Sequence, residues 1–265
     1  MIQKEFAERS GKILENNSLV IGLAVAGSWL TNEIDEFSDL DLIVVTRDKI
    51  TNDKNRMIEL AKSLGDFLSG FTGEHVGEPR VLICLYDNPL LHVDIKFVTL
   101  DEFQLRIETP VILLDKEEKL HDALLHSTPN FPYPNYQWIE DRFWTWIHYA
   151  LLKIGRGELV EAFDFFGFLR MVVLGPLLHI KNGNLPRGVR KVETQLQDED
   201  FHDLLLTIPA YTKQSLIDSL VASVTLYRKL RKSLFDNAVQ LQSAAENRVM
   251  KYFEEFKQQA GLSKH

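Results

Sequence analysis

The first half of the chain alternates between short apolar runs and polar segments. Residues 2–16 and 57–68 place apolar side chains at helical spacing, which predicts two amphipathic helices. Apolar runs bounded by polar or turn residues predict strands at residues 19–26, 40–46, 80–86, 91–98 and 110–114. The turn sequence Asp87-Asn88-Pro89 predicts that the third and fourth of these strands form a hairpin.

The pattern changes after about residue 128. The stretch STPNFPYPNY carries three prolines and predicts a linker. Beyond it, spacing favours helices at residues 138–154, 159–180, 201–206, 215–234 and 238–256. We therefore predict an α/β (α+β) head with a mixed sheet at residues 1–128 and a C-terminal α-helical bundle at residues 129–265.

Composition adds limits on partners. The 265 residues are 45% hydrophobic and 26% charged, which is typical of a folded protein with one or two cores. The net charge of −8 argues against a protein that grips the nucleic-acid backbone, because that task needs clustered cations. Two basic stretches, at residues 181–191 and 228–232, are interpreted as solvated faces.

The single cysteine and the apolar runs bear on location. Cys84 has no partner for an internal disulfide, so we expect a reducing compartment, the cytoplasm. Its apolar neighbours indicate a buried, inert thiol. The N-terminus has no apolar signal core, and the stretch at residues 171–180 is short and contains Pro176. We therefore expect no membrane as a partner.

Two aspartates stand at the mouth of a predicted strand. Asp39 and Asp41 lead into Leu42-Ile43-Val44-Val45, and alternation along a strand places both carboxylates on one face. Like charges so close repel unless solvent or a cation lies between them. Carboxylate oxygens suit Mg²⁺, which binds through a few carboxylates and substrate phosphates.

Further residues would complete such a site. Asp94, in an alternating strand, is the candidate third carboxylate, and the alternative is an aspartate paired with Lys96 on a solvated sheet face. Gly27 follows an apolar strand and would let the backbone approach a ligand closely. If a short helix begins near Ser28, its N–H groups and hydroxyl would face an anion such as a triphosphate. The alternative is an ordinary turn with Ser28 as N-cap.

Together these residues resemble the nucleotidyltransferases of the DNA polymerase beta superfamily. The shared pattern is an apolar strand, Gly-Ser, a gap of roughly ten residues, Asp-x-Asp entering a strand and a third Asp on a later strand. The match covers about the first 100 residues. The layout is most similar to antibiotic nucleotidyltransferases, which modify aminoglycosides or lincosamides and pair a small head with a helical bundle. The stretch WTWIHYALLKIGRGELVEAFDFFGFLRMVV is similar to their first bundle helices.

The resemblance implies a reaction and its parts. A nucleoside monophosphate, AMP from ATP or another nucleotide, would pass to a hydroxyl of a small, aminoglycoside-like molecule with release of pyrophosphate. Asp39 and Asp41 would hold a Mg²⁺ ion on the triphosphate, and Asp94 would hold a second or act as base. Gly27 and Ser28 would position the β- and γ-phosphates.

The resemblance also implies a nucleotide contact from the bundle. Lys153 is the first candidate and Arg170 the second, and for each the alternative is a solvated or salt-bridged helix residue. A separate general base is not singled out by the sequence; the candidates are Glu74, Glu78, Asp87 and Glu140.

Other functions stay open at this point. The acceptor would be a protein if the chain were an antitoxin-like AMP-transferase, and the head would be a nucleotide-binding or interaction module if it were not catalytic. Arg142 and His148 resemble the active pair of HEPN-type toxin ribonucleases, although Phe143 stands where that family has a polar residue.

Overall fold

The computed structural model describes residues 1–259, and the chain divides into two compact units. Unit 1 comprises Met1–Phe131 and unit 2 comprises Pro132–His265. The division lies within the proline-containing stretch, close to the boundary predicted at residue 128. Each unit has its own hydrophobic core.

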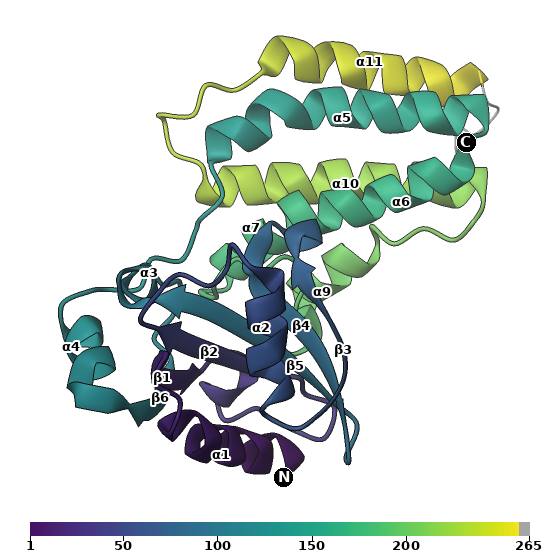
Figure 1. Cartoon of the computed structure of the whole chain (residues 1–265). Coiled ribbons are helices and arrows are strands. Elements are labelled where there is room, and N and C mark those ends of the chain that lie inside the picture. The colour runs from purple at the N-terminus through teal and green to yellow at the C-terminus, as the bar shows by residue number, and fades with distance from the viewer. Residues whose placement is uncertain (260–265) are drawn as a thin grey trace. The chain divides into compact units, whose positions relative to one another are not determined.

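A mixed six-stranded sheet forms the centre of unit 1 (Figure 1). Its spatial order is β3-β4-β5-β2-β1-β6, and only β2 and β5 pair in parallel. The predicted mixed sheet and the β4–β5 hairpin are therefore confirmed. The strands are β1 (Val20–Val25), β2 (Leu40–Thr46), β3 (Asp66–Gly73), β4 (Glu78–Asp87), β5 (Leu91–Thr99) and β6 (Val111–Asp115).

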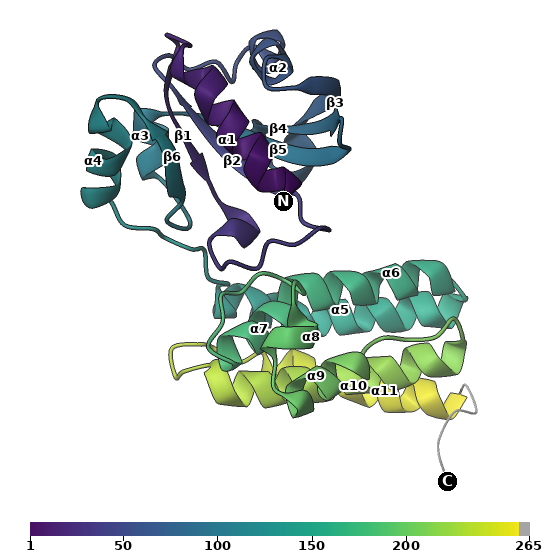
Figure 2. The same cartoon turned by 90° about the horizontal axis from the view of Figure 1, so that it is seen from below.

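Helices cover the two faces of this sheet unequally. On one face, α1 (Ile2–Glu15) and α2 (Lys54–Lys62) bury residues such as Phe6, Leu14 and Met57 against the strands. On the other face, α3 (Leu100–Gln104) and α4 (Lys119–Leu125) pack Phe103 and Leu120 over β1, β2 and the end of β5. Figures 1 and 2 both show α3 and α4 beside β6, at the opposite end of the sheet from β3. Single 3-10 turns are η1 (Gly27–Trp29), η2 (Glu74–Val76) and η3 (Lys116–Glu118).

The helix predicted at residues 57–68 is wrong in its second half. α2 ends at Lys62, and the chain from Asp66 forms edge strand β3, paired with β4. The apolar side chains of β3 are half or more exposed in places, with Leu68 at 53%, so the segment lacks the continuous apolar run of a buried strand. Pairing with β4, which is not visible in local spacing, decides its conformation.

The described part of unit 2 contains helices and no strand (Figures 1 and 2). The predicted helix at residues 159–180 is one helical run interrupted by a π segment, whereas the helix predicted from residue 238 begins only at Ser243. The elements are α5 (Tyr136–Arg156), α6 (Leu159–Leu169), the π segment η4 (Arg170–Leu174), α7 (Gly175–Lys181), α8 (Val192–Gln195), α9 (Asp198–Leu205), α10 (Lys213–Leu234) and α11 (Ser243–Gln259).

The run Leu159–Lys181 is long and apolar enough, by length and composition alone, to cross a membrane. Half of its apolar window is buried inside unit 2, and the core helix of a soluble bundle passes the same test. The run is therefore weak evidence for a membrane span.

Candidate active site

The predicted carboxylates meet where β2 and β5 run side by side. Parallel pairing places Asp41 directly opposite Asp94, and neighbouring strands are about 4.8 Å apart. Asp39 lies two residues before Asp41, just ahead of β2, and its carboxylate makes no hydrogen bond or ion pair within residues 1–259. Leu40, Leu42 and Val44 are buried, as alternation predicted.

The pKa of the Asp94 carboxyl reflects its burial and its charged neighbours. Burial raises the pKa of the Asp94 carboxyl, and the nearby charge of Asp39 raises it further. His92 opposes both effects, with Nε2 at 3.0 Å from Asp94 Oδ1. The alternative partner, Lys96, forms an ion pair with Glu78 instead, at 2.8 Å. Asp94 therefore takes part in a carboxylate cluster and not in the simple Asp–Lys pair.

Gly27 brings the Gly-Ser motif against this cluster. Its φ is +63°, and a Cβ built there would lie 1.9 Å from Asp41 Oδ2. Only glycine leaves room for the Asp41 carboxylate at this turn. The Gly27 N–H donates to Glu108 Oε1 at 3.3 Å, so a carboxylate oxygen occupies the amide that was predicted to bind phosphate.

Ser28 lies in the single turn η1 and not in a longer helix. It is not an N-cap, since η1 begins after Ala26 without a side-chain cap. The Ser28 hydroxyl is half-buried and has no hydrogen-bond partner within residues 1–259. It is therefore available to a ligand.

Gln3 is a site-supporting residue that the sequence reasoning missed. Its side chain, fully buried on α1, donates from Nε2 to the carbonyls of Asp35 and Ser38, both at 2.8 Å. Asp35 Oδ1 in turn accepts from Phe37 N and Ser38 Oγ. The loop that leads into Asp39 is thus held from α1. The available signal was a glutamine on the apolar stripe of an amphipathic helix.

The carboxylates fit a hard divalent cation by their chemistry. Asp41 and Asp94 are in register on one face, and a cation would relieve the repulsion between the Asp39 and Asp94 charges. Within residues 1–259, however, no three His, Cys, Asp or Glu side chains already stand in a metal-binding group. The backbone thus places the donors, and their side chains would have to turn toward a bound ion.

Two solved structures are similar to this chain over almost its whole length. No protein-family model and no curated protein sequence matches the chain. The solved structure of an aminoglycoside 6-adenyltransferase from Bacillus subtilis is 18% identical with a TM-score of 0.41, over 96% of this chain and 98% of that one. A nucleotidyltransferase-like protein from Exiguobacterium sibiricum 255-15 is 13% identical with a TM-score of 0.36, over 99% and 92%. Because these identities and TM-scores are low, the functional argument rests on the residues themselves.

The two bundle cations differ in their surroundings. Lys153 Nζ forms ion pairs with Glu158 at 2.7 Å and Glu161 at 2.9 Å, and these bonds raise the pKa of its ammonium group. Arg170, in the π segment, is half-buried and donates to the carbonyl of Thr207 at 2.7 Å. Burial lowers the pKa of its guanidinium, and no carboxylate within residues 1–259 pairs with it.

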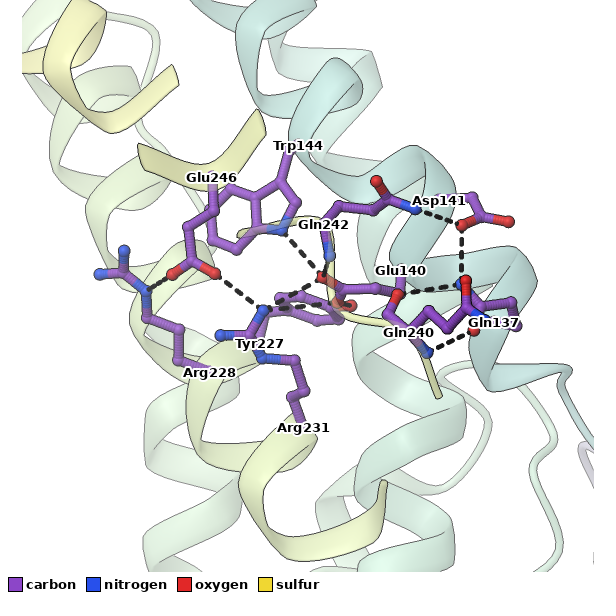
Figure 3. A network of polar contacts seen from close by, with 10 residues as sticks. All are labelled: Gln137, Glu140, Asp141, Trp144, Tyr227, Arg228, Arg231, Gln240, Gln242 and Glu246. Carbon is purple, nitrogen blue, oxygen red and sulfur yellow. Dashed lines mark hydrogen bonds and ion pairs between the residues drawn. The ribbon is translucent and has the colours of Figure 1, made fainter. Parts of the chain in front are cut away.

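Glu140, one candidate general base, belongs to a buried network of unit 2. Figure 3 shows it among α5, α10 and the segment before α11. Its fully buried carboxylate accepts from Tyr227 Oη at 2.5 Å, Gln242 N at 2.9 Å, Arg231 Nη1 at 3.2 Å and Trp144 Nε1 at 3.3 Å. With its lone pairs occupied, Glu140 is a structural residue.

The other candidate bases lie in unit 1. Glu78 is bound by Arg80 and Lys96, which lower the pKa of its carboxyl to about 2. A carboxylate of that pKa is a weak base. Glu74 and Asp87 are both exposed, in η2 and at the end of β4.

Arg142 and His148 do not form a pair. Arg142 stacks over the Trp138 ring at 4.4 Å, while the His148 ring contacts Tyr252 at 5.1 Å. Residues six apart on a helix do not share a face. The structure therefore offers no support for the ribonuclease-like pair.

A cavity of about 670 Å³ lies in unit 2, among α9, α10 and α11. Its lining includes Asp203, Asp218 and Glu254 but none of the predicted site residues. The Asp203 and Glu254 carboxylates are already paired with Lys229 and Lys257.

Proposed function

We propose that the protein is a Mg²⁺-dependent nucleotidyltransferase that moves AMP from ATP, or the corresponding group of another nucleotide, to a hydroxyl of a small molecule. The observation that carries this proposal is the register of β2 and β5, which sets Asp41 opposite Asp94 while the Gly27 backbone lies against Asp41. A phosphate-binding turn and a set of carboxylates at one point are the parts that nucleotidyl transfer needs.

In this reaction the acceptor oxygen forms a bond to the α-phosphorus, the bond from that phosphorus to the bridging oxygen breaks, and pyrophosphate leaves. Gly27 N–H and the Ser28 hydroxyl would bind phosphate oxygens, with Glu108 giving up its place at the Gly27 amide. Asp39 and Asp41, with Asp94, would hold Mg²⁺, which neutralises phosphate charge and lowers the pKa of the acceptor hydroxyl.

In the alternative role, Asp94 would receive the acceptor proton. Burial and the charge of Asp39 raise the pKa of its carboxyl, which makes it a stronger base than a solvated aspartate. A base role and a metal-ligand role for Asp94 remain alternatives within the proposal.

A nucleotide contact from unit 2 is part of the proposal, and the contacts favour Arg170 over Lys153. A half-buried guanidinium without a carboxylate partner gains more from an anion than a lysine already paired with two glutamates. Either contact would add positive charge to the phosphates.

The test is pyrophosphate release from ATP, GTP, CTP and UTP, with aminoglycosides and lincosamides as acceptors. Asp39→Asn and Asp41→Asn should each lower the rate by at least about 10²-fold, because metal binding contributes several kcal/mol to such transfers. Asp101→Asn, an exposed aspartate on α3, is the matched control and should retain the rate. Full activity of either site variant, with the fold intact by circular dichroism, would reject the proposal.

A further inference from the structure

The sheet face that carries the aspartates continues as an apolar surface. Ile83 on β4 lies opposite Asp94, and Phe71 on β3 lies opposite Ile83. Residues opposite one another project from the same face, so Phe71, Ile83, Asp94 and Asp41 form one row across four strands. Alternation puts two more β4 residues on this face beside Ile83. We call the set Phe71, Val81, Ile83 and Leu85 the apolar shelf.

The shelf is partly open to solvent. Phe71 is 50% exposed and Leu85 37%, and Val81 and Ile83 are half-buried. On the opposite face of β4, Leu82, Cys84 and Tyr86 are buried. This agrees with the alternation that puts the shelf residues of β4 on the other face. Over β1 and the later residues of β2, around Val45, the shelf's own face is covered by α3 and α4. Exposed apolar groups gathered beside a polar site commonly mark a binding surface.

The charged side chains beside the shelf already have partners. Lys96 and Arg80 share the carboxylate of Glu78, at 2.8 and 2.6 Å. Asp94 has His92 as its neighbour, and the Phe71 ring contacts His75. A polycationic acceptor would therefore meet apolar side chains on the side of Asp94 away from Asp41.

We infer that the shelf holds the body of the acceptor, and that the acceptor carries an apolar or aromatic group next to its reactive hydroxyl. This inference rests on the proposed function, since it places the hydroxyl at Asp94. With a strand spacing of about 4.8 Å, Ile83 lies one spacing from Asp94 and Phe71 two, about 5 and 10 Å. An aromatic or alkyl group joined to a hydroxylated ring spans that distance.

The experiment compares two probes that share their hydroxyls, methyl and phenyl β-D-glucoside. The ¹³C-methyl resonance of Ile83 is followed in the full chain with Mg²⁺ and a non-hydrolysable ATP analogue. We expect the phenyl glucoside to shift this resonance and to bind at least about tenfold more tightly than the methyl glucoside. Phe71→Ala should remove that tenfold preference, and Phe71→Leu should restore part of it. Leu125→Ala, an 82% exposed leucine on α4, is the control and should keep the preference.

Equal binding of the two glucosides, or an unchanged preference in Phe71→Ala, would overturn the inference. In turnover, a lincosamide with its alkyl chain should be used in preference to an aminoglycoside, and the reverse order would also overturn it. Calorimetric titration of the protein with Mg²⁺ and the nucleotide analogue separates the inference about the shelf from the proposed function. Nucleotide binding without a phenyl preference rejects only the shelf, whereas absent nucleotide binding rejects the proposed function.

Discussion

At the scale of single residues, Gly27 shows how tightly the site is built. Two demands apply to this residue: a positive φ in the turn η1 that follows β1, and contact with the Asp41 carboxylate. The first demand favours glycine and the second excludes any side chain. The sequence motif Gly-Ser therefore reports a backbone that lies against a carboxylate, which periodicity alone does not reveal.

This predicts different outcomes for two glycines with similar backbones. Gly27→Ala should abolish pyrophosphate release, because the methyl group would displace the Asp41 carboxylate. Gly77→Ala, at φ +78° with nothing within 4 Å of its Cβ, carries the backbone strain without the clash. It should cost about 1 kcal/mol of stability and leave activity unchanged. Urea unfolding measures the stability of each variant, and the pyrophosphate assay measures its activity. Equal activity of the two variants would contradict the predicted clash between residue 27 and Asp41.

At the scale of elements, α1 contributes more than a packed apolar face. Its buried stripe includes Phe6, Ala7 and Leu14, as amphipathic spacing predicts, and also Gln3 and Ser10. Gln3 ties the loop before Asp39 to the helix, so α1 determines where that aspartate enters β2. Spacing predicted the helix but not the loop that it binds, because the partners are backbone carbonyls more than thirty residues away.

Replacing Gln3 should therefore affect catalysis as well as folding. Gln3→Leu removes both donors, and we expect pyrophosphate release to fall by about tenfold or more because Asp39 is misplaced. The unfolding free energy should drop by about 1–3 kcal/mol. Ser10→Ala is the control on the same buried stripe, since the Ser10 hydroxyl has no partner within residues 1–259. It should leave activity intact, and a similar loss there would show that α1 acts only through packing.

The β4–β5 hairpin carries a pH-dependent stabilisation. Its ion pairs lower the pKa of the Glu78 carboxyl from the usual 4.5 to about 2. A lowered folded-state pKa stabilises the protein fully above pH 4.5, and the contribution is lost as the pH falls toward 2. The gain is modest because the Glu78 side chain is 27% exposed. Urea midpoints measured across pH should show Glu78→Gln below wild type at neutral pH and converging with it in acid. A constant difference at every pH would contradict this.

At the scale of the whole molecule, the chain is two units with separate cores. Three of the four tryptophans, Trp138, Trp144 and Trp146, lie in unit 2, so fluorescence reports mainly on that unit. The Glu140 network joins α5 and α10 to the segment before α11 inside unit 2. Its buried charge is acceptable because Arg231, Tyr227 and Trp144 all donate to it.

Removing that carboxylate should destabilise unit 2 selectively. Glu140→Ala leaves the half-buried Arg231 with one carboxylate fewer and should lower the unfolding free energy seen by tryptophan fluorescence by about 3–5 kcal/mol. Glu199→Ala breaks an ion pair at a carboxylate that is 79% exposed and should change stability by less than about 1 kcal/mol. Similar losses in the two variants would show that the network contributes no more than a surface pair.

The sequence by itself determined most of the longer helices and the buried strands, because burial on one side of an element imposes a period that local spacing records. The short helices α3, α4 and α8 were not predicted, because they are too short to show such a period. The two-part organisation and the three aspartates were also visible in the sequence. The hidden strand β3 and the support from Gln3 were not, and neither was the row that joins Phe71 and Ile83 to Asp94 and Asp41. Those features depend on strand order and register, in which β5 crosses to pair with β2. Pairing between distant segments is decided by packing of the whole unit, so only the tertiary structure places the candidate site and the surface beside it.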